Sequence, residues 1–292
     1  MSQHDGILGK LNNAREVLGD LGQIIMANPG TAMSRARFVA GKVPSMVEGL
    51  KLIGKKDKAE TLSIGTFLER NAREWPDAPA LFFEDMRFTH RQLNDNANRY
   101  ANLYAKRGVG KGDPVAIFVD NRPELLFAVA GAIKLGAIAA LINTKQRKHV
   151  LTHSFRLCEA RAFVVGEELW PAFAEVRDTL PGADPEHVFF IPDEGDMEPP
   201  RDATDVAAEL GSVSAHTPAA LSEVSLGDPC FYVYTSGTTG LPKASIMSHL
   251  RWVKAAGAFG KLALDLDRDD VIYTPLPLYH NNALTVTWSS AA

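Results

Sequence analysis

The sequence has few cysteines, little net charge and no long apolar run, and each shortage excludes a class of protein. The two cysteines among its 292 residues, Cys158 and Cys230, have neither metal-ligand spacing nor an evident disulfide role. A formal net charge of −4, without a stripe of basic and aromatic residues, gives no footprint for nucleic acid. We find no secretory leader, repeat or low-complexity tract. A cytoplasmic location is therefore expected.

The most apolar stretch, residues 125–142, is interrupted by Lys134 and Gly136. It therefore predicts a buried helix at 124–135 that turns into a buried strand at 137–142, rather than a membrane span.

Helical and strand patterns alternate from residue 61 onward. Helices are expected at 64–73, 92–107, 150–158 and 171–178, and strands at 80–83, 87–89, 115–119, 162–165 and 188–191. Beyond residue 227 we expect strands at 231–234, 244–247 and 271–274, a helix at 249–262 and a helical start near Asn282. The fold class predicted is α/β, with layered helices on mainly parallel sheets.

Three regions follow from this pattern. Residues 1–60 form a helical arm, 61–227 a first α/β subdomain, and 228–292 the start of a second, incomplete one. In the arm, apolar residues recur at helical spacing from Leu8 to Ile25, and the stretch 43–53 is followed by several lysines. Such a pattern is typical of an interfacial membrane helix or of an extension packed on the main domain, and we favour the second. Peripheral contact with the inner face of a membrane remains open.

Residues 235–243, which we call the phosphate loop, interrupt two β-type runs with hydroxyls and glycines. Gly237 and Gly240 allow a tight turn in which backbone N–H groups approach a ligand closely. The loop also offers short hydroxyl donors and an exit cation, at Thr235, Ser236, Thr238, Thr239 and Lys243. The glycines are three apart and a strand follows, so this is not a Walker A loop. The remaining interpretations are a polyphosphate cradle and a hairpin without ligand.

The full string from Tyr234 to Lys243 resembles the signature loop of the AMP-forming adenylating enzymes, which include acyl-CoA synthetases. The run Pro-Leu-Pro-Leu-Tyr-His at 275–280, which we call the edge segment, is similar to that superfamily's Pro-Leu-x-His element. Residues 75–81 and 88–94 resemble its N-terminal pattern. Residues 121–125, 141–147 and 151–154 look most like the fatty-acid-transport-protein branch, the very-long-chain acyl-CoA synthetases. The resemblance runs from about residue 61 to residue 292.

The resemblance implies a two-step reaction. A carboxylate attacks the α-phosphorus of ATP to give acyl-adenylate and pyrophosphate, and the thiol of coenzyme A then takes the acyl group. It implies that the phosphate loop holds the β- and γ-phosphates, that Thr235 offers an oxygen to Mg²⁺, and that His280 lies between the nucleotide and carboxylate sites. No residue present is assigned as catalytic. Tyr279 and Trp288 are expected in the core or pocket wall, Asp77, Glu84 and Asp85 in turns, and Arg122 as a helix cap.

Members of the superfamily also carry later elements that do not occur in this sequence. These are a Tyr-Gly-x-Thr-Glu element whose glutamate holds Mg²⁺, an aspartate on the ribose, a hinge, and a mobile C-terminal domain with a lysine. We therefore expect a truncated N-terminal half, inactive alone, of a ligase that activates a long-chain fatty acid. One alternative is a non-catalytic remnant that binds nucleotide, lipid or a partner protein. A weaker one is an amino-acid or aryl-acid adenylation domain. The sequence carries no signal for an oligomeric state.

Overall fold

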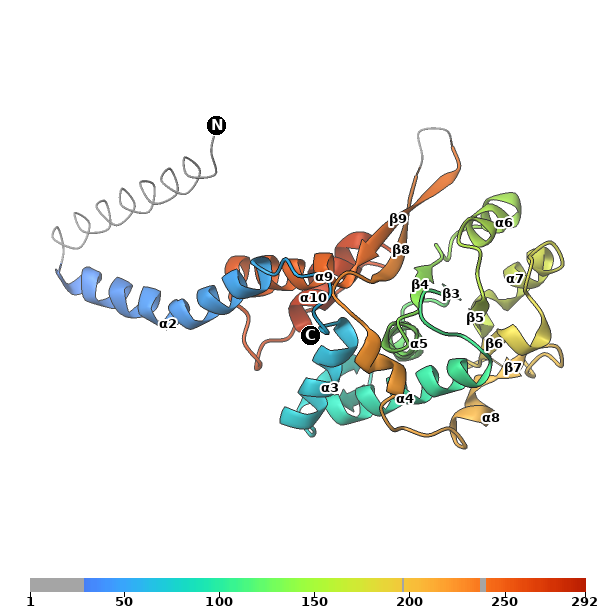
Figure 1. Cartoon of the computed structure of the whole chain (residues 1–292), viewed down its shortest axis with the longest axis horizontal. Coiled ribbons are helices and arrows are strands. Elements are labelled where there is room, and N and C mark those ends of the chain that lie inside the picture. The colour runs from blue at the N-terminus through green and yellow to red at the C-terminus, as the bar shows by residue number, and fades with distance from the viewer. Residues whose placement is uncertain (1–28, 196, 237–239) are drawn as a thin grey trace. The chain divides into compact units, whose positions relative to one another are not determined.

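The structure, a computed structural model, describes residues 29–195, 197–236 and 240–292 (Figure 1). The chain divides into two compact units between Glu48 and Gly49. Helix α2 (Pro29–Ile53) crosses this boundary and contains Pro44. The expected helical pattern from Leu8 to Ile25 lies outside the described residues. The predicted boundaries at 60/61 and 227/228 stay predictions.

A mainly parallel sheet forms the centre of the second unit, as predicted. Its strands lie in the order β7-β6-β5-β3-β4-β8-β9, and every neighbouring pair is parallel except β8 and β9. The strands are β3 (Pro114–Phe118), β4 (Ile138–Leu141), β5 (Ala162–Gly166), β6 (Val188–Ile191), β7 (Thr204–Asp205), β8 (Pro229–Ser236) and β9 (Pro242–Ser248). The predicted hairpin at 80–89 is also confirmed, as β1 (Pro79–Phe83) paired with β2 (Met86–Thr89).

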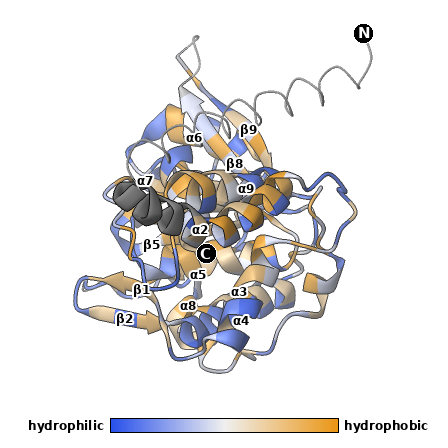
Figure 2. Cartoon of the chain, turned by 90° about the vertical axis from the view of Figure 1, so that its left-hand side faces the viewer, coloured by the Kyte–Doolittle hydropathy of each residue, from blue (hydrophilic) through white to orange (hydrophobic). Residues whose placement is uncertain are grey.

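Helices cover both faces of the sheet because both faces of each inner strand are apolar. In β3, Val115 and Ile117 point into a larger core, whereas Ala116 and Phe118 point into a smaller one. The larger core packs against α3 (Ile64–Glu74), α4 (His90–Lys106) and α5 (Pro123–Lys134). The smaller core packs against α6 (Lys148–Leu157) and α7 (Trp170–Arg177), which lie on the opposite side of the strands from α4 (Figure 1). Figure 2 shows the hydrophilic side of α4.

Local sequence explains where α3 and α4 begin. Ser63 and Thr66 form a reciprocal capping box at the start of α3, and Thr89 and Gln92 form another at the start of α4. Each box satisfies two backbone N–H groups that the first helical turn leaves unpaired. Short connecting elements complete the unit: η1 (Glu167–Leu169), η2 (Pro185–His187), α8 (Val206–Leu210) and η3 (Ala219–Glu223).

The region after residue 227 continues the same sheet, since β8 pairs with β4. The predicted helix at 249–262 is confirmed as α9 (His249–Ala255), which continues as the π-helical segment η4 (Ala256–Ala263). The predicted helical start near Asn282 is η5 (Asn282–Thr287), followed by α10 (Trp288–Ala291).

The predicted strand at 271–274 is wrong, because these residues have no regular secondary structure. Val271 and Tyr273 are 73% and 84% exposed. Alternating apolar residues form a strand only where another strand accepts the backbone hydrogen bonds. No strand in the described part of the chain pairs with them.

The apolar stretch at 125–142 is the buried helix α5 followed by the buried strand β4, as expected. Within residues 29–195, 197–236 and 240–292, no helix is both long and apolar enough to cross a membrane. Cys158 and Cys230 are buried free thiols.

Candidate functional site

The hairpin of β8 and β9 carries the two ends of the phosphate loop. Thr235 lies directly opposite Lys243 in the antiparallel register, and Ser236 lies opposite Pro242. Residues directly opposite in such a pair point to the same face, so the Thr235 hydroxyl and the Lys243 ammonium group share one face of the hairpin. Both side chains are exposed. Gly240 has a φ of 86°, a left-handed conformation that favours glycine.

Gly237, Thr238 and Thr239 lie outside the described residues, so their predicted phosphate contacts stay predictions. The hairpin projects beyond the other strands of the sheet (Figure 1). Because β8 runs parallel to β4, the phosphate loop follows the carboxyl end of its strand, on the same edge of the sheet as the residues that follow β4. Ligands of open α/β sheets bind at this edge.

The edge segment lies on the same face of the sheet as Thr235 and Lys243. Phe231 and Val233 alternate with Tyr232 along β8 and point into the larger core, so Thr235, two residues further, points to that side as well. Leu278 belongs to the same core and Tyr279 packs against it. The structure thus places the edge segment and the Thr235–Lys243 pair at one edge and on one face of the sheet.

Two hydrogen bonds fix the edge segment to the end of β3. The Asn121 side chain donates from Nδ2 to the Leu276 carbonyl oxygen at 2.9 Å. Its Oδ1 accepts from the Leu278 backbone N–H, also at 2.9 Å. Asn121 was not among the residues predicted for the site. Its position in the short turn after a parallel strand is the signal that would have indicated it.

Tyr279 and His280 occupy the end of the edge segment. Their ring centroids are 4.5 Å apart, with the ring planes tilted by 49°. Burial and the Asp120 carboxylate raise the pKa of Tyr279, and a hydrogen bond with Thr144 opposes the rise. His280 is exposed to solvent. The expectation that Tyr279 forms part of a wall agrees with its half-buried position; the role of His280 stays a prediction.

Helix α6 supports the base of the phosphate loop from the other face. The Tyr234 hydroxyl donates to the Ser154 carbonyl oxygen at 2.9 Å. His153 Nε2 lies 3.0 Å from the Pro242 carbonyl oxygen, and since a carbonyl only accepts, this nitrogen carries the proton. These contacts fix both strands of the hairpin, close to the phosphate loop, against α6.

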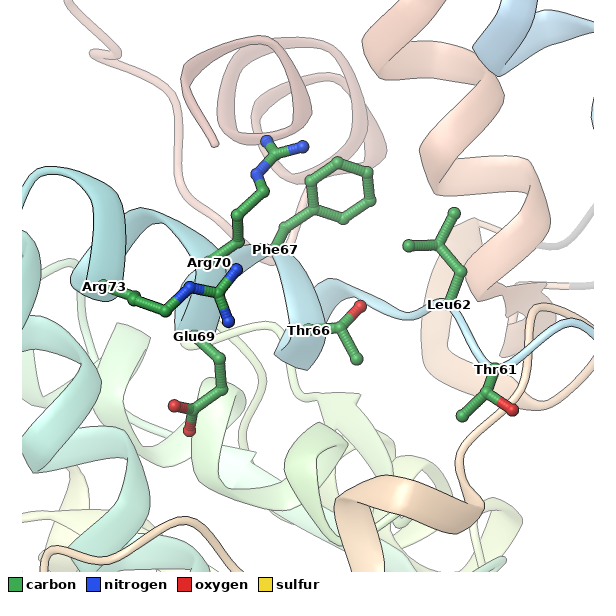
Figure 3. Close-up of a pocket in the computed structure, with 7 residues that line it drawn as sticks. All are labelled: Thr61, Leu62, Thr66, Phe67, Glu69, Arg70 and Arg73. Carbon is green, nitrogen blue, oxygen red and sulfur yellow. The ribbon is translucent and has the colours of Figure 1, made fainter.

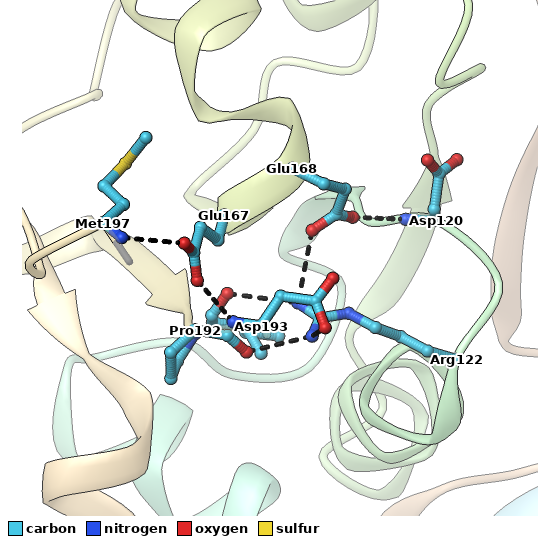
Figure 4. Close-up of polar contacts among 8 residues, drawn as sticks. Asp120, Arg122, Glu167, Glu168, Pro192, Asp193 and Met197 are labelled. Carbon is cyan, nitrogen blue, oxygen red and sulfur yellow. Dashed lines mark hydrogen bonds and ion pairs between the residues drawn. The ribbon is translucent and has the colours of Figure 1, made fainter. Parts of the chain in front are cut away.

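Arg122 joins the carboxyl ends of three strands (Figure 4). Its guanidinium donates to the carbonyl oxygens of Ile191 and Pro192, and forms ion pairs with Glu168 at 3.4 Å and Asp193 at 3.0 Å. Arg122 occupies the N-cap position of α5 as expected, but its side chain makes no capping hydrogen bond. A guanidinium has only donors, whereas the first N–H groups of a helix need an acceptor.

Two glutamates after β5 complete this network. Glu168 accepts from the Asp120 backbone N–H at 2.8 Å. Glu167 accepts from the backbone N–H groups of Asp193 and Met197 at 2.6 Å and 3.0 Å. Burial raises the pKa of Glu168, and the bond from Asp120 opposes the rise. Hydrogen bonds and ion pairs therefore connect the ends of β3, β5 and β6 beside the candidate site.

A surface depression of about 310 Å³ lies along α3, away from these contacts (Figure 3). Seven residues line it: Thr61, Leu62, Thr66, Phe67, Glu69, Arg70 and Arg73. None of the predicted site residues is among them. Nor do three His, Cys, Asp or Glu side chains of the described chain gather as a metal site requires, so the predicted Mg²⁺ contact of Thr235 stays a prediction.

The protein is thus an α/β protein with a mainly parallel sheet. At the carboxyl edge of that sheet, strand β8 leads into a loop rich in hydroxyl groups and glycine, and Lys243 follows this loop. The chain belongs to the AMP-binding enzyme family, whose pattern matches residues 68–292. The resemblance to the adenylating enzymes is thereby confirmed.

Two curated relatives illustrate the branch. The chain is 42% identical over 228 residues to the medium/long-chain fatty-acid–CoA ligase FadD6 of Mycobacterium tuberculosis, covering 78% of this chain and 36% of that protein. It is 36% identical over 224 residues to long-chain fatty acid transport protein 2 of Rattus norvegicus, covering 75% of this chain and 35% of that protein. The chain thus spans about a third of the length of these relatives.

Solved structures share the fold. The anthranilate CoA ligase AuaEII in complex with anthranoyl-AMP superposes with a TM-score of 0.74 at 26% identity, over 82% of this chain and 45% of that chain. The N-terminal domain of FACL13 from Mycobacterium tuberculosis gives a TM-score of 0.65 at 30% identity, over 78% and 55% of the two chains.

Proposed function

We propose that this chain binds the phosphates of ATP at its phosphate loop and takes part in the AMP-forming activation of a long-chain fatty acid. One observation carries the proposal: Thr235 and Lys243 share a face of the β8–β9 hairpin, and the edge segment lies on that same side of the sheet. A nucleotide held by the hairpin would have its acyl partner beside the edge segment.

The chemistry explains why this arrangement is useful. A fatty-acid carboxylate and the ATP triphosphate are both negatively charged, so their approach requires positive charge and fixed geometry. Lys243 supplies the charge beside the hydroxyl of Thr235. Mg²⁺, which binds through few protein oxygens, would be held there by the phosphates and Thr235. Tyr279 and His280 would form the wall beside the α-phosphate. Coenzyme A would accept the acyl group in the second step.

The relatives favour a long-chain acid over an aryl or amino acid. The two curated relatives are named for medium- or long-chain fatty acids, whereas the aryl-acid ligase is a structural neighbour at lower identity. We also propose a cytoplasmic location with peripheral membrane contact through residues 1–60, supported by the apolar stretch at 43–53 and the lysines around it.

Nucleotide binding is tested by calorimetry with Mg²⁺ and ATP on the wild type and the Lys243→Ala variant. Loss of one phosphate contact should weaken binding by about tenfold. Lys56→Ala is the matched control, since it removes the same charge from an exposed site outside the sheet. Equal affinity in all three proteins, or no binding by the wild type, would overturn the proposal.

Acid activation is tested by ATP–pyrophosphate exchange on a full-length ligase that contains this sequence, because the 292-residue chain is expected to be inactive alone. The panel consists of saturated fatty acids, benzoate, anthranilate and amino acids. The proposal expects exchange with long-chain acids alone. Nucleotide binding without exchange for any acid would instead support the non-catalytic alternative. Exchange driven by an aryl or amino acid would replace the proposed substrate.

A further inference from the structure

The turn between β3 and α5 is held firmly on one side and holds the edge segment on the other. On the first side, the Asp120 backbone N–H bonds Glu168, and the Arg122 guanidinium reaches the ends of β6. These bonds leave the residue between them, Asn121, with its backbone fixed. Its side chain faces the edge segment, 155 and 157 residues further along the chain.

The Asn121 amide matches the edge segment in hydrogen-bonding capacity. A carboxamide offers donors and an acceptor on one neutral head group, and both kinds are used: the donor on the Leu276 carbonyl oxygen and the acceptor on the Leu278 N–H. Leu276 and Leu278 belong to no helix or strand, so no ladder fixes their backbone. A serine is too short to make both bonds, and an aspartate cannot donate.

The position of the edge segment is passed on to its last two residues. Leu278 is buried in the larger core, which fixes the point from which Tyr279 starts. The Tyr279 ring lies against the His280 ring. The backbone N–H of His280 donates to the Pro277 carbonyl oxygen at 3.0 Å. On the far side, the Leu284 N–H donates to the His280 carbonyl oxygen at 3.1 Å. The direction of His280 therefore depends on where Asn121 places Leu276 and Leu278.

We propose that Asn121 is a positioning residue: it sets Tyr279 and His280 relative to the phosphate loop. The purpose of that placement, alignment of nucleotide and acyl carboxylate, rests on the function proposed above. The placement itself does not, since it is a property of the chain without ligand.

The test uses the full 292-residue chain with Asn121→Ala and Asn121→Asp. Asn102→Ala is the matched control, because Asn102 also makes two hydrogen bonds to a distant backbone, at Ser214 and His216, but has none to the edge segment. Nuclear magnetic resonance would follow amide exchange at Leu278 and the imidazole signals of His280, first without nucleotide and then with Mg²⁺ and ATP.

Asn121→Ala should speed Leu278 exchange by about tenfold, the equivalent of one hydrogen bond, and shift the His280 signals. Asn121→Asp retains the acceptor, so Leu278 should stay protected while the His280 signals still shift. Asn102→Ala should change neither. With ATP, both Asn121 variants should bind more weakly than the control.

Unchanged His280 signals in both Asn121 variants would overturn the inference, as would an equal shift in Asn102→Ala. If Asn121→Ala does not fold, Asn121→Asp decides the question through His280 alone. If the wild type binds no ATP, the proposed function fails, and the measurements without nucleotide still decide whether Asn121 positions His280.

Discussion

Single polar side chains connect segments of this protein that are far apart in the sequence. Asn121 and Arg122 do so at the carboxyl edge of the sheet, and His249 does so in the interior. His249 is fully buried at the start of α9, and its Nδ1 accepts from the Ile64 N–H, at the start of α3, at 3.2 Å. Among the described residues its Nε2 has no hydrogen-bond partner. The interior therefore favours the neutral ring.

His249 should make folding stability depend on pH. Burial lowers its pKa from 6.5 to about 4; Asp228 opposes this shift and Lys111 adds to it. The pKa of His249 is lower in the folded state than in the unfolded state. The neutral His249 ring therefore contributes its full share of the folding stability above pH 6.5, and this share is lost as the pH falls toward 4. The imidazolium would also lose the acceptor for Ile64. The loss should reach on the order of 3 kcal/mol.

The measurement compares the unfolding free energy of the wild type with that of His249→Gln between pH 7 and pH 4. The difference between the two proteins should shrink steadily over this range. Carboxylates that titrate in acid without interacting with His249 affect both proteins alike and cancel. A difference that stays constant would contradict the assignment.

At the scale of helices and strands, hydrophobic periodicity predicted most of the fold. The alternation at 115–191 gave the strands and helices of the parallel sheet to within about two residues at each end. Lys134 shows the limit of such reasoning. It argued against a membrane span, yet it is fully buried, with its Nζ at 2.5–2.6 Å from Glu69, Asn94 and Asn98. Those partners lie on other helices, and no local pattern contains them.

The wrong prediction of a strand at 271–274 and the failure to predict the contact of Asn121 have the same reason. Whether an apolar run becomes a strand depends on a neighbouring strand, and whether an asparagine belongs to a site depends on a segment more than a hundred residues away. The hairpin that carries the phosphate loop and its family could be predicted because their signature is a run of consecutive residues. The edge contacts could not, since they are tertiary.

Gly131 determines how closely α4 and α5 pack. A Cβ at this position would lie 2.6 Å from Tyr100 Cβ and 2.9 Å from the Ala101 backbone nitrogen. We expect Gly131→Ala to destabilise the protein by about 1–3 kcal/mol, although alanine favours helices by about 1 kcal/mol over glycine. Urea unfolding measures the change.

Gly211→Ala is the control for this substitution. Gly211 has helical dihedral angles (φ −62°, ψ −27°), and nothing lies within 4 Å of an added Cβ. The control should leave stability unchanged or raise it slightly. Equal effects of the two substitutions would show that close packing of α4 and α5 is not the cause.

At the scale of the whole molecule, the order of strands decides which regions resist opening. Within residues 228–292, β8 lies between β4 and β9, so its backbone is paired on both sides.

Hydrogen exchange followed by mass spectrometry should therefore divide the region after residue 227. Amides of β8 should exchange slowly, and those of 271–274, which belong to no helix or strand, should exchange much faster. Protection of 271–274 equal to that of β8 would contradict this order. It would mean that the segment is covered in solution.

The strand order also has a consequence during synthesis. Ala139 of β4 pairs with Phe231 of β8, so roughly 90 residues must be translated after the first partner before the second exists, which takes on the order of 5–20 s at about 5–20 residues per second. Throughout that interval β4 pairs with β3 on one side and has an open edge on the other. An open edge of an apolar strand attracts other chains. Slow or stalled translation between β4 and β8 should therefore send newly made protein into aggregates, even where every residue of the finished fold is intact.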